Sequence, residues 1–233
     1  MTVRIAKFIA DCGIASRRGA EELIAKGVVS VNDHAINTPV FFVNPEQDVV
    51  KVNGRIIEMR RTDHLYMFHK PLNTMTTTSD PQGRRTIYNC LPMEYRSLRY
   101  VGRLDYRTTG LLLLTDDGEL AHKLSLPESG IRRVYIATVG NVDLSGLDAA
   151  RRGMTIDGTQ YRPMKIDSIG GGRLRIEVTE GKKNEIRIVL RECGAPVRKL
   201  HRVAFGPIKL GTLAVGKIQA VPQKTIDELL KSL

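Results

Sequence analysis

The sequence has little of what marks several common classes of protein. Its three cysteines, Cys12, Cys90 and Cys193, are scattered and form no C-x-x-C pair. This spacing argues against a disulfide framework and a zinc site, and it indicates a reducing compartment. No apolar run approaches the roughly 20 residues that span a bilayer, and the N-terminus lacks the apolar segment of a signal peptide. We therefore expect a cytoplasmic protein that does not bind a membrane.

Motifs that bind metals, nucleotides or redox cofactors are also missing. The chain contains no H-E-x-x-H pair and no dinucleotide-binding fingerprint. The run Gly170 to Gly172 is not followed by the lysine and serine of a phosphate-binding loop. We interpret it as a hairpin turn between strands at 166–169 and 174–178. The sequence thus predicts neither a metal nor a cofactor.

Basic residues, in contrast, are in excess, with a formal net charge of +11 and a pI of about 9.8. Such a balance favours a polyanionic partner, either nucleic acid or an anionic membrane surface. No amphipathic basic helix or lipidation motif supports the membrane alternative. Residues Met1 to Arg61 carry a net charge of only +2, whereas the stretch from Lys182 to Lys209 carries +6. The main basic patch therefore belongs to the C-terminal part.

The first 61 residues have the pattern of a small domain. Apolar residues recur at helical spacing from Ile5 to Ile9, and Ser16 is a candidate N-cap for a second helix. The pair Asn53-Gly54 predicts a tight hairpin turn between two short strands. Two helices followed by short strands are enough for a minimal domain.

A polar interval from Glu58 to His64 separates this domain from the rest of the chain. We interpret it as a linker and place the domains at residues 1–61 and 62–233. In the larger domain, alternation at 131–139 predicts a strand, and apolar spacing at 186–193 predicts a helix. The fold class expected from these patterns is α+β.

One carboxylate, Asp105, stands out in the stretch Y-V-G-R-L-D-Y-R-T-T-G-L-L-L-L-T-D-D-G, which runs from Tyr100 to Gly118. The four leucines followed by a turn predict a short buried strand, and the segment before them, with Gly102 and Gly110, predicts a loop. Catalytic groups are commonly carried by loops on a rigid scaffold. By spacing alone, however, an Arg-x-Asp-x-Arg stretch is more often a solvated surface ion pair.

The same stretch resembles the signature of bacterial RNA pseudouridine synthases of the small-subunit-enzyme (RsuA) family. The resemblance implies that Asp105, the aspartate of G-R-L-D, is the essential catalytic residue. It also implies a small N-terminal S4 RNA-binding domain and a larger catalytic domain, in which helices flank a mainly antiparallel mixed β-sheet. The resemblance extends over nearly the whole chain, from about Arg4 to Leu230.

The N-terminal domain itself resembles the S4 domain through R-I-A-K-F-I-A, G-I-A-S-R-R and L-I-A-K-G-V-V-S-V-N. This resemblance implies that Arg17, Arg18 and Lys26 contact RNA phosphates. Without it, a solvated helix end is the simpler interpretation of the two arginines. Gly19 replaces the acidic residue that completes the family's capping box, which predicts a weaker helix start.

A second group of basic residues belongs to the segments H-K-P and D-P-Q-G-R-R-T, which resemble the family's substrate-strand motifs. The resemblance implies that Lys70, Arg84 and Arg85 lie near the RNA, and ordinary surface charges are the alternative for each. Asn73 stands where the family commonly has glycine. Asparagine tolerates positive φ better than other residues with a side chain, so we expect the turn to form.

Three further motifs supply candidates for the substrate pocket. I-R-R-V-Y-I-A-T-V resembles a family strand whose tyrosine lies in the active site, which implies this position for Tyr135; by itself it is a half-buried strand residue. E-G-K-K-N-E-I-R resembles the helix whose arginine, here Arg187, is the partner of the catalytic aspartate. V-R-K-L-H-R implies that Leu200 packs beside the uracil and that Arg202 is its basic neighbour.

The implied reaction breaks the N-glycosidic bond of a uridine, rotates the uracil and joins its C5 to the ribose. One carboxylate suffices, either as nucleophile toward the sugar or as a base that removes a ribose proton, and the sequence leaves both roles open. Arg187 would favour the ionised aspartate, and Arg103 would fill the space of the extruded base. Tyr135 and Leu200 would enclose the uracil. Salt-sensitive phosphate contacts are expected from Lys182, Lys183, Arg198, Lys199 and Arg202.

The sequence therefore predicts a monomeric enzyme that forms pseudouridine in ribosomal RNA or a ribosomal subunit precursor. The D-P-Q-G-R-R-T loop favours the large-subunit synthase B type, and hence 23S over 16S rRNA. The alternative is a non-catalytic RNA-binding or ribosome-assembly protein that retains the fold.

Overall fold

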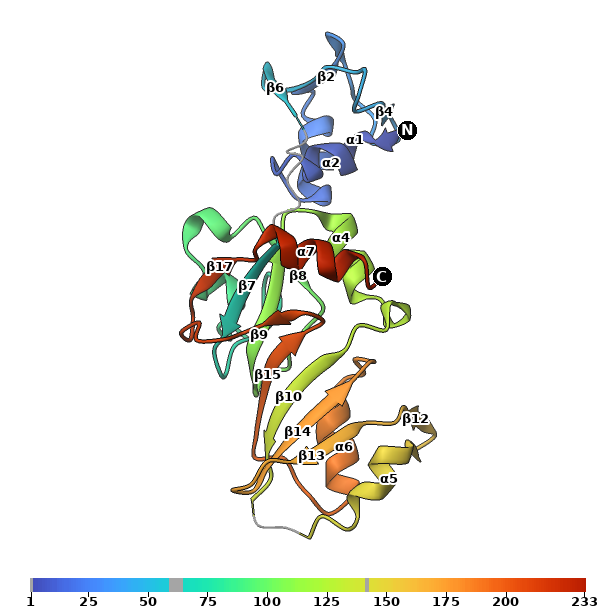
Figure 1. The fold of residues 1–233 in the computed structure, drawn as a ribbon. Helices are drawn as coiled ribbons and strands as arrows, with labels where there is room; N and C mark the ends of the chain where they lie inside the picture. Colours follow the sequence, from blue (N-terminus) through green and yellow to red (C-terminus); the bar gives the residue numbers. More distant parts are fainter. Residues whose placement is uncertain (1, 59–64, 141–142) are drawn as a thin grey trace. The chain divides into compact units, whose positions relative to one another are not determined.

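The computed structural model describes residues 2–58, 65–140 and 143–233, and these form two compact units (Figure 1). The first comprises Met1–Asp63 together with Asp116–Gly118, and the second comprises His64–Thr115 and Glu119–Leu233. The predicted boundary between residues 61 and 62 lies outside the described residues, so that position stays a prediction.

The first unit packs two helices against short antiparallel strands. The helices α1 (Ile5–Asp11) and α2 (Arg17–Ala25) share one apolar core with a four-stranded sheet of order β3-β2-β5-β6. β1, which directly precedes α1 in the chain, forms a separate antiparallel pair with β4. The strands are β1 (Val3–Arg4), β2 (Val29–Val31), β3 (His34–Ala35), β4 (Phe42–Val43), β5 (Val50–Val52) and β6 (Arg55–Ile57).

Local signals in the sequence set the boundaries of these elements. The Ser16 side chain accepts a hydrogen bond from the Gly19 N–H at 3.0 Å, so the predicted cap forms even without an acidic partner. Asn53 and Gly54 have φ values of 50° and 74° and join β5 to β6, as a tight hairpin turn requires. The predicted helices and hairpin of this unit are thus present.

A nine-stranded sheet forms the centre of the second unit. Its main order is β13-β14-β10-β15-β9-β7-β17, with β8 also paired to β9 and β16 to β15. All pairs are antiparallel except β15 with β9. The strands are β7 (Leu65–Lys70), β8 (Arg99–Val101), β9 (Thr108–Thr115), β10 (Arg133–Thr138), β13 (Lys165–Ser168), β14 (Arg173–Val178), β15 (Lys199–Phe205), β16 (Ile208–Lys209) and β17 (Ile218–Ala220).

The run of four leucines lies in β9, the strand on which the two cores meet. Leu112 and Leu114 belong to one apolar cluster, whereas Leu111 and Leu113 belong to the other. A strand covered on both faces has a continuous apolar sequence rather than an alternating one, which explains the run. The strand starts at Thr108, so the prediction that Gly110 lies in a loop is wrong.

Helices cover the two halves of the sheet differently (Figure 1). The apolar residues of α5 (Leu147–Arg152) and α6 (Glu185–Glu192) share a core with β10, β13 and β14, and those of α4 (Gly118–Ser125) and α7 (Gln223–Leu230) share the other core with β9 and β15. The remaining elements are α3 (Ile87–Cys90), short 3₁₀ turns at Met93–Tyr95 and Pro127–Ser129, and the hairpin of β11 (Met154–Ile156) with β12 (Thr159–Tyr161). Within the described ranges, none of these helices has the length and hydropathy to cross a membrane.

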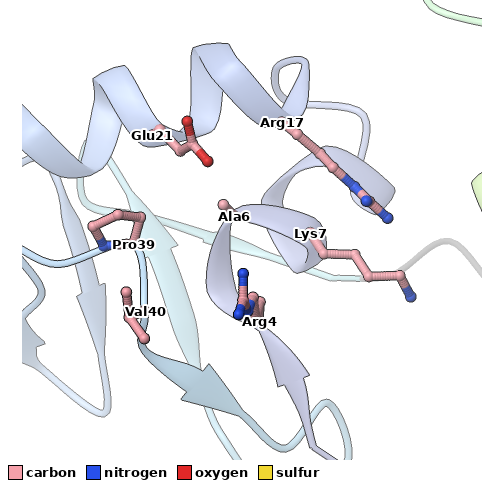
Figure 2. Close-up of a pocket in the computed structure, with 7 residues that line it drawn as sticks. All are labelled: Arg4, Ala6, Lys7, Arg17, Glu21, Pro39 and Val40. Atoms are coloured by element: carbon pink, nitrogen blue, oxygen red, sulfur yellow. The ribbon is translucent and has the colours of Figure 1, made fainter.

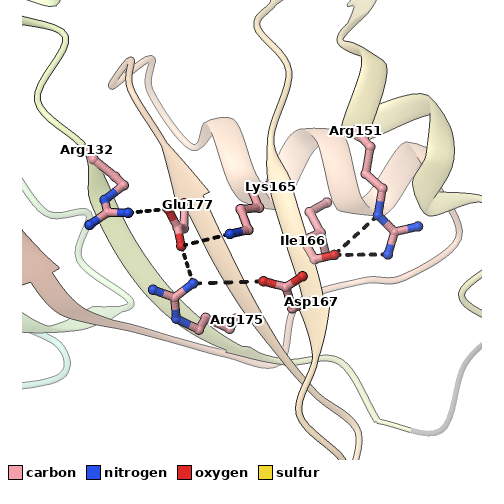
Figure 3. A network of polar contacts seen from close by, with 7 residues as sticks. All are labelled: Arg132, Arg151, Lys165, Ile166, Asp167, Arg175 and Glu177. Carbon is pink, nitrogen blue, oxygen red and sulfur yellow. Dashed lines mark hydrogen bonds and ion pairs between the residues drawn. The ribbon is translucent and has the colours of Figure 1, made fainter.

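The other face of β13 and β14 carries a network of charges centred on Glu177, which is buried (Figure 3). Its carboxylate pairs with Arg175, with Arg132 at 3.1 Å and with Lys165 at 4.0 Å, and Arg175 also lies 3.9 Å from Asp167. Burial by itself raises the pKa of Glu177, but the hydrogen bond from Arg175 and the neighbouring cations hold it below its ordinary value. The carboxylates of this network are therefore neutralised by basic side chains on the same and neighbouring strands.

Candidate active site

Asp105 lies in the loop between β8 and β9, and the loop backbone is firmly held. The buried hydroxyl of Thr76 donates to the Leu104 carbonyl at 2.8 Å and accepts the Leu104 N–H at 3.4 Å. The Asp105 carbonyl accepts the Thr108 N–H at 2.9 Å. Within the described residues, the Asp105 carboxylate itself makes no hydrogen bond or ion pair. Its backbone is thus fixed while its side chain stays available.

Lys70, at the end of β7, supports this loop from within the protein. It is 0% exposed, and its Nζ donates to the carbonyls of Pro71 at 3.1 Å, Asp105 at 3.3 Å and Thr108 at 2.9 Å. Burial lowers the pKa of Lys70 to about 8, although the charge of Asp105 acts in the opposite direction. The prediction that Lys70 contacts RNA is wrong, because no phosphate can reach a side chain that solvent does not reach.

The parallel pairing of β9 with β15 brings Leu200 next to the loop. Leu200 is the register partner of Thr108, and Gly110 is the partner of Arg202. A Cβ on Gly110, at φ +106°, would lie 2.2 Å from the Arg202 carbonyl oxygen. Only glycine permits so close an approach, so this residue fixes the register that places Leu200 beside Asp105.

Arg202 is also buried, at 2% exposed. Its Nε donates to the Leu111 carbonyl at 2.6 Å, and its guanidinium lies 5.5 Å from the centroid of the Phe205 ring. The predicted phosphate contact of Arg202 is therefore wrong. Its side chain points into the sheet, where it links β15 to β9.

Tyr135 enters the site from β10, the strand on the other side of β15. The register between β10 and β15 shifts between Val134 and Tyr135. Irregularities of this kind turn a side chain away from its regular direction and are common beside active sites. Tyr135 is 9% exposed and reaches the same pocket as Leu200 and Asp105.

These residues line a pocket of about 250 Å³ in the second unit. Arg103, Asp105, Tyr135 and Leu200 were predicted from the sequence to bind or convert the substrate, and all four lie in its wall. The other lining residues come from the loop after β8, the end of α4, the loop before α6, α6 itself and the strands β9 and β14. They are Gly102, Leu104, Thr108, Ser125, Val178, Glu180, Gly181, Lys182, Lys183, Asn184, Glu185 and Ile186.

Arg187 lies near the pocket but does not line it. Its Nη2 donates to the Arg107 carbonyl at 2.8 Å, and its Nη1 donates to the Val197 carbonyl at 3.0 Å. Burial lowers the pKa of Arg187, and the charge of Asp105 partly restores it. The two charges thus attract each other, but within the described residues no ion pair joins them. The expected direct partnership is replaced by a contact with the backbone two residues after Asp105.

Two pocket residues were missed by the sequence reasoning. Glu180 and Glu185 are each 5% exposed, and both line the pocket. Glu180 accepts the Arg162 N–H at 2.7 Å and pairs with Lys182. Burial, followed by the hydrogen bond to Glu180 and the charge of Glu180, raises the pKa of Glu185 to about 8. Their spacing in E-G-K-K-N-E was the available signal, but it resembles that of solvated charges.

The first unit has a pocket of its own, of about 430 Å³, and Figure 2 shows the seven side chains around it. Arg17 and Glu21 come from α2, whereas Lys7 comes from α1 and Arg4 from the end of β1. Arg17 was predicted from the sequence, but Arg4 and Lys7 were missed. Their i, i+3 spacing at the start of α1 was the available signal.

The other predicted RNA-contacting residues remain at the surface. Arg84 donates to Asp80 through Nε at 3.0 Å and Nη2 at 2.7 Å, and its side chain is 40% exposed. Such a guanidinium still has free donors for a phosphate. The remaining members of this group are exposed: Arg18, Lys26, Arg85, Lys182, Lys183, Arg198 and Lys199.

Within the described ranges, no group of three or more His, Cys, Asp or Glu side chains is placed to hold a metal ion. The chemistry offered by the pocket is that of one unpaired carboxylate, a tyrosine, and two buried carboxyl groups that share a site. The basic residues Arg103, Lys182 and Lys183 also line the pocket.

Family models match both units of the chain. Residues 64–192 match the model described as RNA pseudouridylate synthase, and residues 3–50 match the S4 domain. An uncharacterized RNA pseudouridine synthase of Aquifex aeolicus is 37% identical over 239 residues, which cover 100% of this chain and 96% of the relative. Another, of Rickettsia prowazekii, is 34% identical over 232 residues and covers 97% of each.

A solved structure supports the fold. The crystal structure of a pseudouridylate synthase matches this chain with a TM-score of 0.70 and 24% identity, over 97% of this chain and 99% of that one. The predicted fold, an N-terminal S4 domain followed by a mixed, mainly antiparallel sheet with flanking helices, is therefore confirmed.

Proposed function

The chain belongs to the RNA pseudouridine synthases and carries an S4 domain, and from this membership we propose that it isomerises a uridine of ribosomal RNA with Asp105 as the catalytic group. Conversion of uridine to pseudouridine in RNA is the activity of its family. The non-catalytic alternative is therefore not favoured. The proposal includes the ribosomal target, the residues that act, and separate roles for residues 1–61 and 62–233.

The observation that carries the assignment of Asp105 is the convergence of three separate segments on one pocket. The loop after β8 contributes Asp105, β10 contributes Tyr135 and β15 contributes Leu200. A carboxylate without a partner in the described structure is free to act on a bound substrate, because no ion pair has to break first. Tyr135 and Leu200 supply the stacking and apolar surfaces that hold an unstacked base.

In the proposed reaction, the target nucleotide leaves its stack and the uracil enters this pocket. Asp105 either attacks the sugar or removes a ribose proton, and the glycosidic bond breaks. The detached uracil turns over, and its C5 joins the ribose as the sugar's bond to Asp105 breaks or as the ribose recovers its proton. C5 then loses its proton and N1 takes one up, so the product is an isomer of the substrate. Arg103, exposed at the pocket rim, is suited to occupy the space that the base has left.

The proposed target is 23S rather than 16S rRNA, as the resemblance of the D-P-Q-G-R-R-T loop suggests. We expect cells that lack the protein to lose a pseudouridine from large-subunit rRNA, and wild-type protein to restore it. Mapping of pseudouridines in total rRNA measures this. An Asp105→Asn variant that restored the modification would contradict the catalytic assignment, whereas a loss confined to 16S rRNA would contradict only the proposed subunit.

The RNA contacts of the S4 domain are proposed to centre on the cationic pocket of the first unit (Figure 2). Arg4, Lys7 and Arg17 lie around one hollow, so neighbouring phosphates of a single RNA strand can meet all three. Arg18 and Lys26 extend the same basic character along α2. This arrangement supplies affinity without reading sequence.

Replacing Arg4, Lys7 and Arg17 together by glutamine is expected to weaken RNA binding and to flatten its salt dependence. Each lost phosphate contact lowers the slope of log K against log salt by roughly 0.7 to 0.9, so three should lower it by about 2 to 3. Binding of a 23S rRNA transcript across a salt series measures this. A control that replaces the exposed Lys217, Lys224 and Lys231 should change the slope much less. Equal slopes in both variants would contradict the role of the pocket.

A further inference from the structure

We propose that Glu185 determines specificity for the target base, by accepting a hydrogen bond from the N3–H of uracil while it donates its own proton to Glu180. The inference rests on the proposed function, because it takes the pocket beside Asp105 to be the uracil site. It assigns a role to the buried pair of carboxyl groups, which the reaction described above does not use.

The contacts indicate which of the two carboxyl groups is charged. Glu180 has partners for both oxygens: Oε1 accepts the Arg162 N–H at 2.7 Å, and Oε2 pairs with Lys182. Glu185 has no ion pair within the described residues, and its buried Oε1 has no hydrogen-bond partner there. Two adjacent buried carboxyl groups cannot both be charged without a large repulsion. Glu180 is therefore the ionised member, and Glu185 holds the proton.

Most of the surroundings of Glu185 also favour its protonated form. Burial is the largest influence, and with the hydrogen bond and charge of Glu180 it raises the pKa of Glu185 to about 8, against a smaller opposite effect of Lys182. Arg133 of β10 acts in the opposite direction, because its positive charge attracts an ionised Glu185. The titratable and charged groups that share its surroundings are Glu180, Lys182, Lys183, Arg133, Tyr135, Arg103 and Asp105.

A protonated Glu185 that donates to Glu180 keeps a carbonyl-type oxygen with unused acceptor capacity. This oxygen matches the unpaired Oε1, on a residue that lines the pocket. Uracil presents a donor at N3, whereas cytosine presents an acceptor at the same ring position. A site with a buried acceptor therefore binds uracil and rejects cytosine, because two acceptors that face each other both remain without a hydrogen bond.

The geometry of the reaction makes N3 a suitable point of contact. The turn that exchanges N1 for C5 takes place about the line through N3 and C6, so N3 stays on the axis while the carbonyl oxygens exchange places. A hydrogen bond to N3–H can therefore persist through the turn. Glu185 forms no covalent bond and keeps its proton throughout, so it acts as a pivot for the detached base.

The test uses the full chain and a 23S rRNA transcript labelled with [5-³H]uridine, because loss of the C5 proton releases tritium wherever the target lies. Glu185→Leu is expected to lower the release about 10- to 100-fold, as the loss of one hydrogen bond in a buried site predicts. Glu185→Gln is expected to restore most of it. Its amide NH₂ can donate to Glu180 while its carbonyl faces the base.

The pH profile separates this role from a structural one. Wild-type activity is expected to fall as pH rises through about 8, because Glu185 then loses the proton that it shares with Glu180. Glu185→Gln cannot ionise, so this fall should be absent. Glu192→Gln removes an exposed charge from the same helix and should retain the wild-type profile. Uracil itself also loses its N3 proton at alkaline pH. The role of Glu185 is therefore tested by the difference between the wild-type and Glu185→Gln profiles.

Two results would overturn the inference. One is a Glu185→Gln profile with the same alkaline fall as wild type. The other is a folded Glu185→Gln variant as inactive as Glu185→Leu, since the ionisable carboxyl would then be required. If Glu185→Leu does not unfold cooperatively, the glutamine profile alone decides. Tritium release by Asp105→Asn would instead indicate failure of the proposed function.

Discussion

Replacing Asp105 by asparagine is expected to reduce pseudouridine formation by roughly three to six orders of magnitude, the range seen when a catalytic group is removed. Asparagine has nearly the same shape, but it can neither attack the sugar with a negative oxygen nor take up a proton. The measurement is tritium release from a [5-³H]uridine-labelled 23S transcript under single-turnover conditions. This is the largest effect that the structure predicts.

The same substitution should leave the fold and the RNA affinity almost unchanged. The Asp105 carboxylate makes no hydrogen bond or ion pair in the described part of the chain and interacts only at longer range with Lys70 and Arg187. We therefore expect the unfolding midpoint to stay close to that of wild type and RNA binding to stay within a few-fold. Asp157→Asn, at an exposed turn with φ 47° that asparagine accepts, is a matched control and should remain fully active. An active Asp105→Asn enzyme would refute the assignment.

Replacing Lys70 by methionine is expected to have the second-largest effect, because it should lower both the stability of the fold and the activity of the enzyme. Methionine preserves most of the buried side-chain volume but leaves the carbonyls of Pro71, Asp105 and Thr108 without their donor. We expect the free energy of unfolding to fall by about 2–4 kcal/mol, as for buried groups that lose their partners. Denaturant unfolding at neutral pH measures this change.

The activity of Lys70→Met should fall by about 100-fold as well, because a catalytic group displaced by about 1 Å loses that much. Lys217→Met removes an exposed lysine from a neighbouring segment, whose carbonyl accepts the His69 N–H, and it should retain both activity and stability. A stable Lys70→Met variant with normal activity would show that the loop does not need this support.

The pH dependence of stability gives an independent check on Lys70. Burial lowers its pKa from 10.5 in an exposed chain to about 8 in the folded protein. Between these values the unfolded chain holds a proton that the folded chain has lost, so stability due to this group rises with pH. The stability difference between wild type and Lys70→Met should therefore widen from about pH 8 toward pH 10.5. A difference that narrows over this window would contradict the buried, cationic state of Lys70 at neutral pH.

Several parts of the fold could be predicted from the sequence because their causes are local. Ser16 caps a helix with its own side chain, and Asn53-Gly54 adopts the positive φ values of a tight turn. Asn73, with φ 53°, does the same in place of the family's glycine. Periodicity also identified the central strand, but its start was placed wrongly. The pairing of Gly110 with the distant Arg202 extends that strand, and no local signal reveals such a pairing.

Basic residues show the limit of sequence reasoning most clearly. Lys70 and Arg202 were grouped with RNA-contacting residues, although both are buried. Lys182 and Lys183, in contrast, are exposed and line the pocket, and their predicted phosphate contacts stay a prediction. A cation that supports a loop and a cation that meets a phosphate have the same side chain. The difference lies in which carbonyls the fold brings within reach, and apart from that of Pro71 these belong to residues far away in the sequence.

The sequence by itself determined the family, the two-part α+β architecture, the basic character and the prominence of Asp105, because long motifs and periodic patterns encode these features along the chain. Only the tertiary structure decided which cations are buried, that Arg187 holds a backbone carbonyl rather than the carboxylate, and that Glu180 and Glu185 share a site. Burial, pairing and the sharing of a proton depend on distances between segments, and those distances exist only once the sheet has its register and the helices have packed on it.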